Sequence, residues 1–220
     1  MLKKFVLFFT CVSLHSFAAV SDLQEWSLFI FQGPKAEKLR AYFEVQPRFG
    51  SDLSKMYTIM VRPAAQYHLT ENSSVWLGYA WTPTFDPIFK DEQRLWQQYQ
   101  FTLPMPSMSF SARTRFEERW IGGVPSTAFR LRQWVRLQIP LTKGETDWNF
   151  VTWDEIFFHL NSPTASIQTG YNQNRIFAGL SRTFYPSIRC EAGYLLNHVH
   201  REAQPDLINH VILTAFYVSF

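Results

Sequence analysis

The chain has 220 residues, with 21 lysines and arginines against 18 acidic residues and an aromatic share of 17%. Removal of the signal segment predicted below takes away two lysines and no acid, so 21 − 2 = 19 basic residues would face 18 acidic ones. Such a nearly neutral chain excludes the basic surface that nucleic-acid binding needs, and we predict no nucleic-acid partner.

The N-terminal segment has the pattern of a secretory signal peptide. Two lysines precede an apolar run that starts at Phe5, and the small residues Ser16 and Ala18 follow it. The run is too short to cross a bilayer as a stable helix. We therefore predict a signal peptide over residues 1–18, cleaved after Ala18. Cys190 is then the one remaining cysteine, so no intramolecular disulfide can form.

From about residue 24 onward, apolar and polar residues alternate in long segments separated by turn residues. A period of two predicts β-strands, here with one apolar face and one charged face. Tilted membrane strands need about 9 to 11 residues, whereas strands of soluble proteins cluster near 5 or 6. The long segments are residues 37–48, 54–68, 73–82, 92–104, 107–120, 127–141, 148–160, 172–184, 187–199 and 208–220.

These lengths predict an all-β fold, an antiparallel transmembrane β-barrel over residues 37–220. Short and long connections alternate along the chain, which indicates short periplasmic turns and longer external loops. An even strand number follows, with ten predicted and twelve as the alternative. Residues 19–36 contain a shorter apolar run, "WSLFIF", and form either a periplasmic lead-in or the first strand.

The C-terminal segment "VILTAFYVSF" ends on an aromatic ring. Ile212, Phe216, Val218 and Phe220 share one parity, which we assign to the lipid-facing side. A terminal aromatic after alternating apolar residues resembles the signal that the barrel assembly machinery reads by strand-edge pairing. We therefore expect this machinery, periplasmic chaperones and outer-membrane lipid as partners.

The other parity of the strands carries charges that we expect to face the lumen. In "TWDEIFF" the phase stays open, and either Asp154 or Glu155 points inward. Two interpretations of these charges stay open. We favour a structural ion-pair network, because a barrel of about ten strands is narrow. The alternative is a lumen that selects anions or binds an acidic ligand. The predicted lumen residues are Arg113, Arg115, Glu117, Arg119, Arg130, Arg132, Arg136, Arg175, Arg189 and Glu191.

Two further groups of residues have structural interpretations. Gly78 and Gly193 are expected to leave room for bulky lumen neighbours, while Tyr79 and Tyr194 point outward. Six tryptophans near strand ends are expected to form interfacial girdles. They are Trp76, Trp81, Trp96, Trp120, Trp148 and Trp153.

Three histidines surround the last long loop, together with Glu202 and Asp206. They are His198, His200 and His210. A metal site or hydrolase dyad would use such residues, but no serine lies in a G-x-S-x-G turn. We interpret them as loop histidines and predict no catalytic, metal or cofactor-binding residue.

Several motifs in order resemble the family of Gram-negative outer-membrane proteins called Domain of Unknown Function twenty-four-ninety. They are "VRP" at 61–63, "VWLGYAW" at 75–81, "EQRLWQQYQF" at 92–101, "ARTRFEERW" at 112–120, "FRLRQWVRL" at 129–137, "WDEIFFHLN" at 153–161, "NQNRIFAGL" at 172–180, "EAGYLLNHV" at 191–199 and "NHVILTAFYVSF" at 209–220. The resemblance implies a barrel in the outer membrane and no particular activity.

The sequence therefore predicts an integral outer-membrane barrel of the bacterial cell. Its role would be structural or that of a narrow, porin-like small-solute barrel, with a charged and largely plugged lumen. The alternative is a surface interaction protein or a lipid-modifying enzyme that uses the external loops near 82–91 and 198–208.

Overall fold

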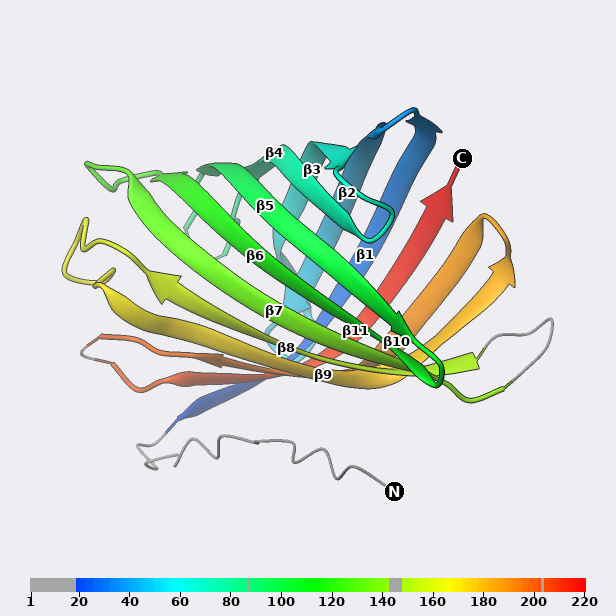
Figure 1. Cartoon of the computed structure of the whole chain (residues 1–220). Coiled ribbons are helices and arrows are strands. Elements are labelled where there is room, and N and C mark those ends of the chain that lie inside the picture. Colours follow the sequence, from blue (N-terminus) through cyan, green and yellow to red (C-terminus); the bar gives the residue numbers. More distant parts are fainter. Residues whose placement is uncertain (1–18, 87, 143–147, 203) are drawn as a thin grey trace, which may run out of the picture.

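The computed structural model describes residues 19–86, 88–142, 148–202 and 204–220, so the predicted signal peptide at 1–18 lies outside the described residues. The described chain is all-β and forms a closed barrel of eleven strands, which confirms the predicted fold class (Figure 1). The strands are β1 (Val20–Ala36), β2 (Leu39–Gly50), β3 (Lys55–His68), β4 (Ser73–Trp81), β5 (Glu92–Met105), β6 (Met108–Ile121), β7 (Ala128–Pro140), β8 (Trp148–His159), β9 (Gly170–Tyr185), β10 (Ile188–Val199) and β11 (Leu207–Ser219). Within these described ranges, no helix has the length and apolar character needed to cross a membrane.

Each strand from β1 to β11 pairs antiparallel with the next one in sequence, and the barrel closes between β1 and β11. This closing pair is parallel and runs without a register shift from Val20 opposite Leu207 to Gln32 opposite Ser219. In Figure 1 the first strand, in blue, lies beside the last strand, in red. Among the described strands, closure therefore leaves no strand at a free sheet edge.

The parallel closure explains why the predicted even strand number is wrong. An even number follows only when every neighbouring pair in the ring is antiparallel, and one parallel pair makes the number odd. The run "WSLFIF" lies within β1, the strand that the sequence analysis left as the alternative to a periplasmic lead-in. Its apolar side chains Trp26 and Ile30 are buried inside the barrel, and Ser27 and Glu25 lie on the other parity.

The two parities of the strands separate sharply in burial. Side chains of the outward parity include large exposed apolar groups on strands around the ring, such as Phe43, Leu77, Tyr99, Ile176 and Phe216. The inward parity holds buried arginines, glutamates, glutamines and aromatic rings. A sheet that exposes apolar side chains on its convex face and buries charges in its centre has the reverse polarity of a water-soluble barrel.

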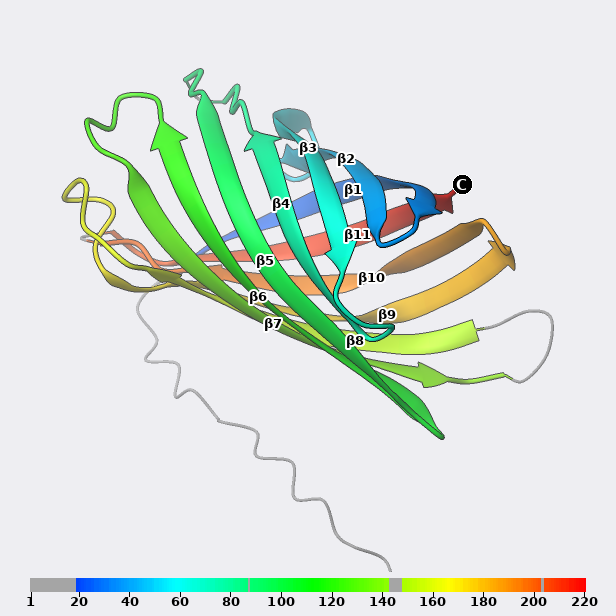
Figure 2. The same cartoon turned by 45° about the horizontal axis from the view of Figure 1, so that its top comes forward.

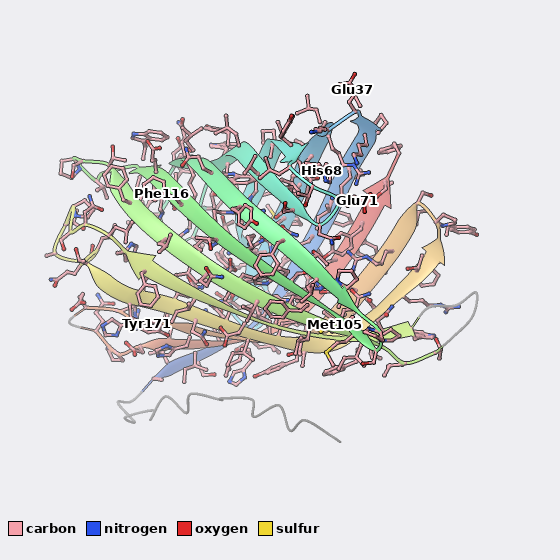
Figure 3. The ribbon with its side chains drawn as sticks, in the orientation of Figure 1. Glu37, His68, Glu71, Met105, Phe116 and Tyr171 are labelled. Atoms are coloured by element: carbon pink, nitrogen blue, oxygen red, sulfur yellow. The ribbon has the colours of Figure 1, made fainter. Side chains whose placement is uncertain are left out.

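The two ends of the barrel differ in their connections. One end, here called the short-turn end, carries the described connections at 37–38, 69–72, 106–107 and 186–187, the end of β7 and the C-terminus. The other, the loop end, carries the described parts of the longer connections at 51–54, 82–86, 88–91, 122–127, 160–169, 200–202 and 204–206, and the start of β1. Figure 2 shows the loops between β6 and β7 and between β8 and β9 together at one end. In Figure 3, Glu37 and Met105 lie at the short-turn end and Tyr171 lies at the opposite end.

Glycines in the wall make room for buried rings, as the sequence predicts. A Cβ atom built on Gly78 would overlap the indole of Trp96 and lie 2.8 Å from Ala64 Cβ. Gly193 faces Gly179 on the neighbouring strand, and the ring of Phe177 covers both. Tyr79 and Tyr194, next in sequence, are exposed on the outside.

The predicted tryptophan girdle is wrong for half of its members. Trp96 is only 1% exposed, and Trp76 and Trp153 line the interior cavity described below. Trp81, Trp120 and Trp148 are exposed, as a girdle requires. The inward parity of the first three rings places them inside the barrel, whatever their distance from the strand ends.

The parallel closure can be tested by cross-linking. The Ser27 Oγ and Thr214 Oγ1 atoms lie 3.0 Å apart across β1 and β11. In a Cys190→Ser background, S27C with T214C should form a disulfide, detected as a mobility shift on non-reducing gels. The pair S27C with T114C joins strands that are not neighbours and should stay unlinked. An unlinked S27C/T214C protein would contradict a β1 that closes the barrel.

The close contact between Gly78 and Trp96 predicts that a methyl group added at residue 78 lowers the stability of the barrel. Gly78→Ala should lower the free energy of unfolding by about 1–3 kcal/mol, because the added carbon has no space beside the ring. Urea unfolding in detergent micelles measures this change. Gly33→Ala is the matched control, since its Cβ would meet only ordinary contacts, the nearest at 3.4 Å. Combining Gly78→Ala with Trp96→Leu should recover part of the loss, and equal costs in both backgrounds would refute the fit.

Candidate functional site

The charged part of the interior is built on β6, β7 and β8. The sheet register places Arg115 opposite Arg132 and Glu117 opposite Arg130, while Trp134 on β7 is opposite Glu155. All of these side chains have the inward parity, because period-two strands point alternate residues to the same side. The open choice at 154 and 155 is resolved: Glu155 is buried inside, and Asp154 accepts a hydrogen bond from Asn174 on the outward parity.

Two buried glutamates, Glu117 and Glu155, bind Arg132 and so join the charged side chains of β6, β7 and β8. The Arg132 guanidinium donates to Glu117 Oε1 at 2.7 Å and to Glu155 Oε1 at 2.8 Å. Glu117, which is 1% exposed, also accepts from Arg130 Nε at 2.9 Å. Arg113 forms an ion pair with Glu155 at 2.5 Å. Charge-assisted bonds of this kind are the strongest that side chains make, and these join β6, β7 and β8.

The other predicted lumen residues form two further groups, except Arg175, which belongs with Glu155. Glu191 pairs with Arg136 at 2.7 Å and with Arg189 at 3.3 Å. Arg119 pairs with Glu92 at 2.6 Å, and Arg175 lies 4.0 Å from Glu155. The sequence reasoning missed other charged residues of the inward parity, although that parity was readable, namely Arg40, Glu44, Arg48, Arg62, Glu92 and Arg94.

Arg115 differs from its neighbours because it has no carboxylate partner among the described residues. Its Nε and Nη2 both donate to the neutral Gln98 Oε1, at 2.9 and 2.6 Å. Its guanidinium carbon lies 4.0 Å from the ring centroid of Trp96. The residue is only 3% exposed, and its buried Nη1 has no hydrogen-bond partner.

The interior is not uniformly charged. A cluster of buried apolar side chains fills the side formed by β1 and β8 to β11, with Trp26, Val151, Phe177, Leu195, Val211, Leu213 and Ala215 as members. The rings of Trp153 and Phe177 stack with their centroids 5.2 Å apart, and Trp153 is opposite Arg136 on β7. This stack therefore lies between the apolar cluster and the arginines of β6 and β7. The lumen therefore has an apolar half and a cationic half, which the sequence prediction of a charged centre did not anticipate.

Two cavities flank the centre of the lumen. The one at the short-turn end has a volume of about 510 Å³ and the one at the loop end about 480 Å³. Five side chains line both cavities and form the layer between them: Trp26, Arg48, Arg62, Arg132 and Arg175. Arg48 lies over the Trp26 ring at 3.9 Å and Arg175 lies over it at 4.8 Å, so stacked charges and one indole make up this layer.

The three histidines predicted to be loop residues form two groups at the loop end. The prediction is wrong for two of them, since His198 lies in β10 and His210 in β11, and only His200 lies in the loop. His198 Nε2 and His200 Nδ1 lie 2.9 and 3.0 Å from the two Asp206 carboxylate oxygens, and Tyr171 contacts the other His198 nitrogen. His210 contacts Tyr194 instead. Partial burial acts to raise the pKa of Asp206, but the Arg201 backbone N–H and the two histidines hold that pKa below its usual range.

This histidine cluster contains no nucleophile or metal site in the part of the chain that the structure describes. No serine or cysteine side chain there hydrogen-bonds to the three histidines, and no group of three His, Cys, Asp or Glu side chains is placed to hold a metal ion. Asp206 instead ties the loop to the barrel, since its backbone oxygen also accepts from Val20 N at 3.0 Å. The arrangement has the features of a loop anchor.

The predicted assembly residues lie on the outside of β11. Ile212 and Phe216 are exposed, and Phe216 stacks on Phe29 of β1 with ring centroids 5.4 Å apart. Val218 has the same parity, and Phe220 is 74% exposed. The Phe220 backbone nitrogen donates to Gln32 O, so the last residue is held against β1.

The fold and the interior define a class of protein: a closed eleven-stranded β-barrel with an apolar exterior and a cavity-bearing, arginine-rich lumen. The chain belongs to the DUF2490 family, described as a protein of unknown function, whose family model matches residues 23–208. It is also similar to an uncharacterised protein of Methylorubrum extorquens, with 31% identity over 186 residues that cover 82% of this chain and 81% of the relative. No solved structure matches the chain.

The Glu117 network predicts that substitutions of the adjacent residues Glu117 and Glu118 change the free energy of unfolding by different amounts. Glu117→Gln should lower the free energy of unfolding by about 3–5 kcal/mol, because it leaves Arg130 and part of Arg132 buried without their carboxylate. Urea unfolding of the refolded barrel, followed by tryptophan fluorescence, measures the loss. Glu118→Gln is the matched control on the outward parity, where Glu118 accepts only a 3.4 Å bond from Gln97, and should cost less than about 1 kcal/mol. Similar costs for both variants would contradict a structural role for the network.

Proposed function

We propose that the protein is an integral outer-membrane β-barrel with a largely plugged lumen, acting as a structural or narrow small-solute barrel. The observation that carries this proposal is the polarity of the wall, with exposed apolar side chains outside and buried charges inside. In water such a surface would favour aggregation, whereas in a bilayer it contacts hydrocarbon.

Strand length and connections support the same conclusion. Every strand has at least the nine residues of β4, which agrees with the roughly 9 to 11 that a tilted membrane strand needs. The full hydrogen-bonded closure removes every backbone edge, which hydrocarbon requires because it offers no hydrogen-bonding partner. The predicted signal peptide and the exposed aromatic residues at the end of β11 fit export and insertion by the barrel assembly machinery, aided by periplasmic chaperones.

The layer between the two cavities supports a plugged rather than an open lumen. Trp26 is 2% exposed, with Arg48 and Arg175 packed over its ring. A barrel of this strand number has an interior that side chains can fill, whereas wide aqueous channels need many more strands. Together these features support a barrel that passes few or no ions in its resting state.

Membrane insertion and conductance test the proposal. The mature chain, residues 19–220, should require detergent for solubility, and in planar bilayers it should show no large discrete channel openings. Trp26→Ala removes the central ring of the layer and should raise the conductance at least several-fold. Trp120→Ala removes an exposed outer ring and should leave conductance unchanged.

Two results would contradict different parts of this proposal. A mature chain that stays monomeric in water without detergent and ignores lipid vesicles would exclude the membrane location. Wide, steady channels from the unmodified protein would exclude the plugged lumen while leaving the membrane location intact.

A further inference from the structure

The cavity at the short-turn end has an excess of positive charge. Nine arginines and three glutamates are among the residues that line its volume of about 510 Å³. The difference, 9 − 3 = 6, is large for a space enclosed by a β-sheet wall. Buried charges in proteins are ordinarily paired, so an unbalanced set of this size indicates a missing partner.

Two of the three glutamates are shared between arginines and the third pairs with one arginine, so they cannot neutralise the remainder. Glu155 pairs with Arg113 and Arg132 and lies 4.0 Å from Arg175. Glu191 pairs with two arginines as well, and Glu44 pairs with Arg62 at 3.2 Å. One carboxylate carries one negative charge, so each shared carboxylate leaves a guanidinium uncompensated. Glu117, which does not line the cavity, also pairs with Arg132 but is itself shared with Arg130.

Three of the nine arginines form no ion pair with a described carboxylate, namely Arg40, Arg48 and Arg115. Each has a buried N–H group without a hydrogen-bond partner: Nε of Arg40, Nε of Arg48 and Nη1 of Arg115. Trp96, under the Arg115 guanidinium, has an unpartnered buried indole N–H too. These are donors only, and a ligand that satisfies them must supply acceptor oxygens.

The electrostatic environment of Arg115 points the same way. Arg113 lies two residues before it on the same face of β6, Arg132 is opposite it on β7, and Arg62 of β3 lines the same cavity, whereas its own nitrogens bond to no carboxylate. Cations from β3, β6 and β7 therefore converge on one region of the cavity with net repulsion between them. An anion placed among them would convert that repulsion into attraction.

We propose that the cavity at the short-turn end binds a small soluble anion that carries more than one negative charge, of the phosphate or carboxylate type. Arginine is suited to this chemistry because its planar fork donates two parallel hydrogen bonds to such groups. The volume lies within the range of small-molecule sites, and the rings of Tyr42, Trp76 and Trp134 offer apolar walls for an organic part of the ligand.

The position of the cavity favours a soluble ligand over a lipid headgroup. Its lining includes Pro186, Ser187 and Ser219 at the short-turn end, so its mouth lies along the barrel axis. The wall between the cavity and the outside is a continuous ladder of paired strands. A lipid headgroup would have to leave its leaflet and enter through the end of the barrel.

Binding of inorganic phosphate and pyrophosphate to the mature chain in detergent micelles tests this site. Tryptophan fluorescence is the readout, because the Trp96 ring lies directly beneath Arg115. Phosphate and pyrophosphate should produce a saturable change at constant ionic strength, with pyrophosphate the tighter ligand. Sodium chloride at equal ionic strength should produce none.

Arginine variants locate the site. Arg115→Gln should weaken pyrophosphate binding at least tenfold, because it removes a central cation and the unpartnered donor. Arg182→Gln is the matched control: this arginine lies over the Trp148 and Phe184 rings and does not line the cavity, so binding should be unchanged. If Arg115→Gln fails to fold, Arg40→Gln replaces it and should also weaken binding.

Three outcomes would overturn the anion site. The first is a chloride effect as large as the phosphate effect. The second is pyrophosphate binding by the cavity variants that is as tight as binding by the unmodified chain. The third is binding of short-chain phosphatidic acid while both soluble anions fail to bind, which would assign the site to a lipid headgroup. These measurements use detergent and record no current, so their failure is distinguishable from an open lumen or a soluble chain.

Discussion

The double ion pair of Arg132 with Glu117 and Glu155 is the interaction on which the interior depends. It joins three consecutive strands at the middle of the wall, and the same arginine lines both cavities. Desolvating three charges is costly, and good geometry with several hydrogen bonds is what offsets that cost. The position of this arginine therefore fixes where the lumen is filled and where it stays open.

The two halves of the lumen use different means to fill space. On the side of β1 and β8 to β11, rings and aliphatic groups pack together, and the facing glycines 179 and 193 admit Phe177. On the other side, arginines stack on indoles and share a small number of carboxylates. A cationic wall without equal acidic content is a costly way to fill a barrel, and this cost is the physical reason to expect an anion there.

Sequence alone predicted ten of the eleven strands, because each alternates apolar and polar residues over a long run. It left β1 as an alternative because a strand there places its start at the loop end, which an all-antiparallel ring does not allow and the parallel pairing with β11 does. Inward parity identified the lumen arginines, but the partner of Arg113 lies 42 residues away, and register between strands is invisible in a single sequence. Trp96 was misplaced because position along a strand was weighed before parity, although Gly78 already indicated a buried ring.

The parallel seam also determines where the two ends of the barrel chain emerge. Val20 begins β1 at the loop end, whereas Phe220 follows β11 at the short-turn end. Thirteen paired residues separate these positions along the seam, which at roughly 3.3 Å per residue is about 40 Å of strand. A circular permutant that joins Val20 to Phe220 would need a linker that spans the whole height of the barrel. Tags fused at the two positions would report opposite sides of any sheet of lipid that the barrel crosses.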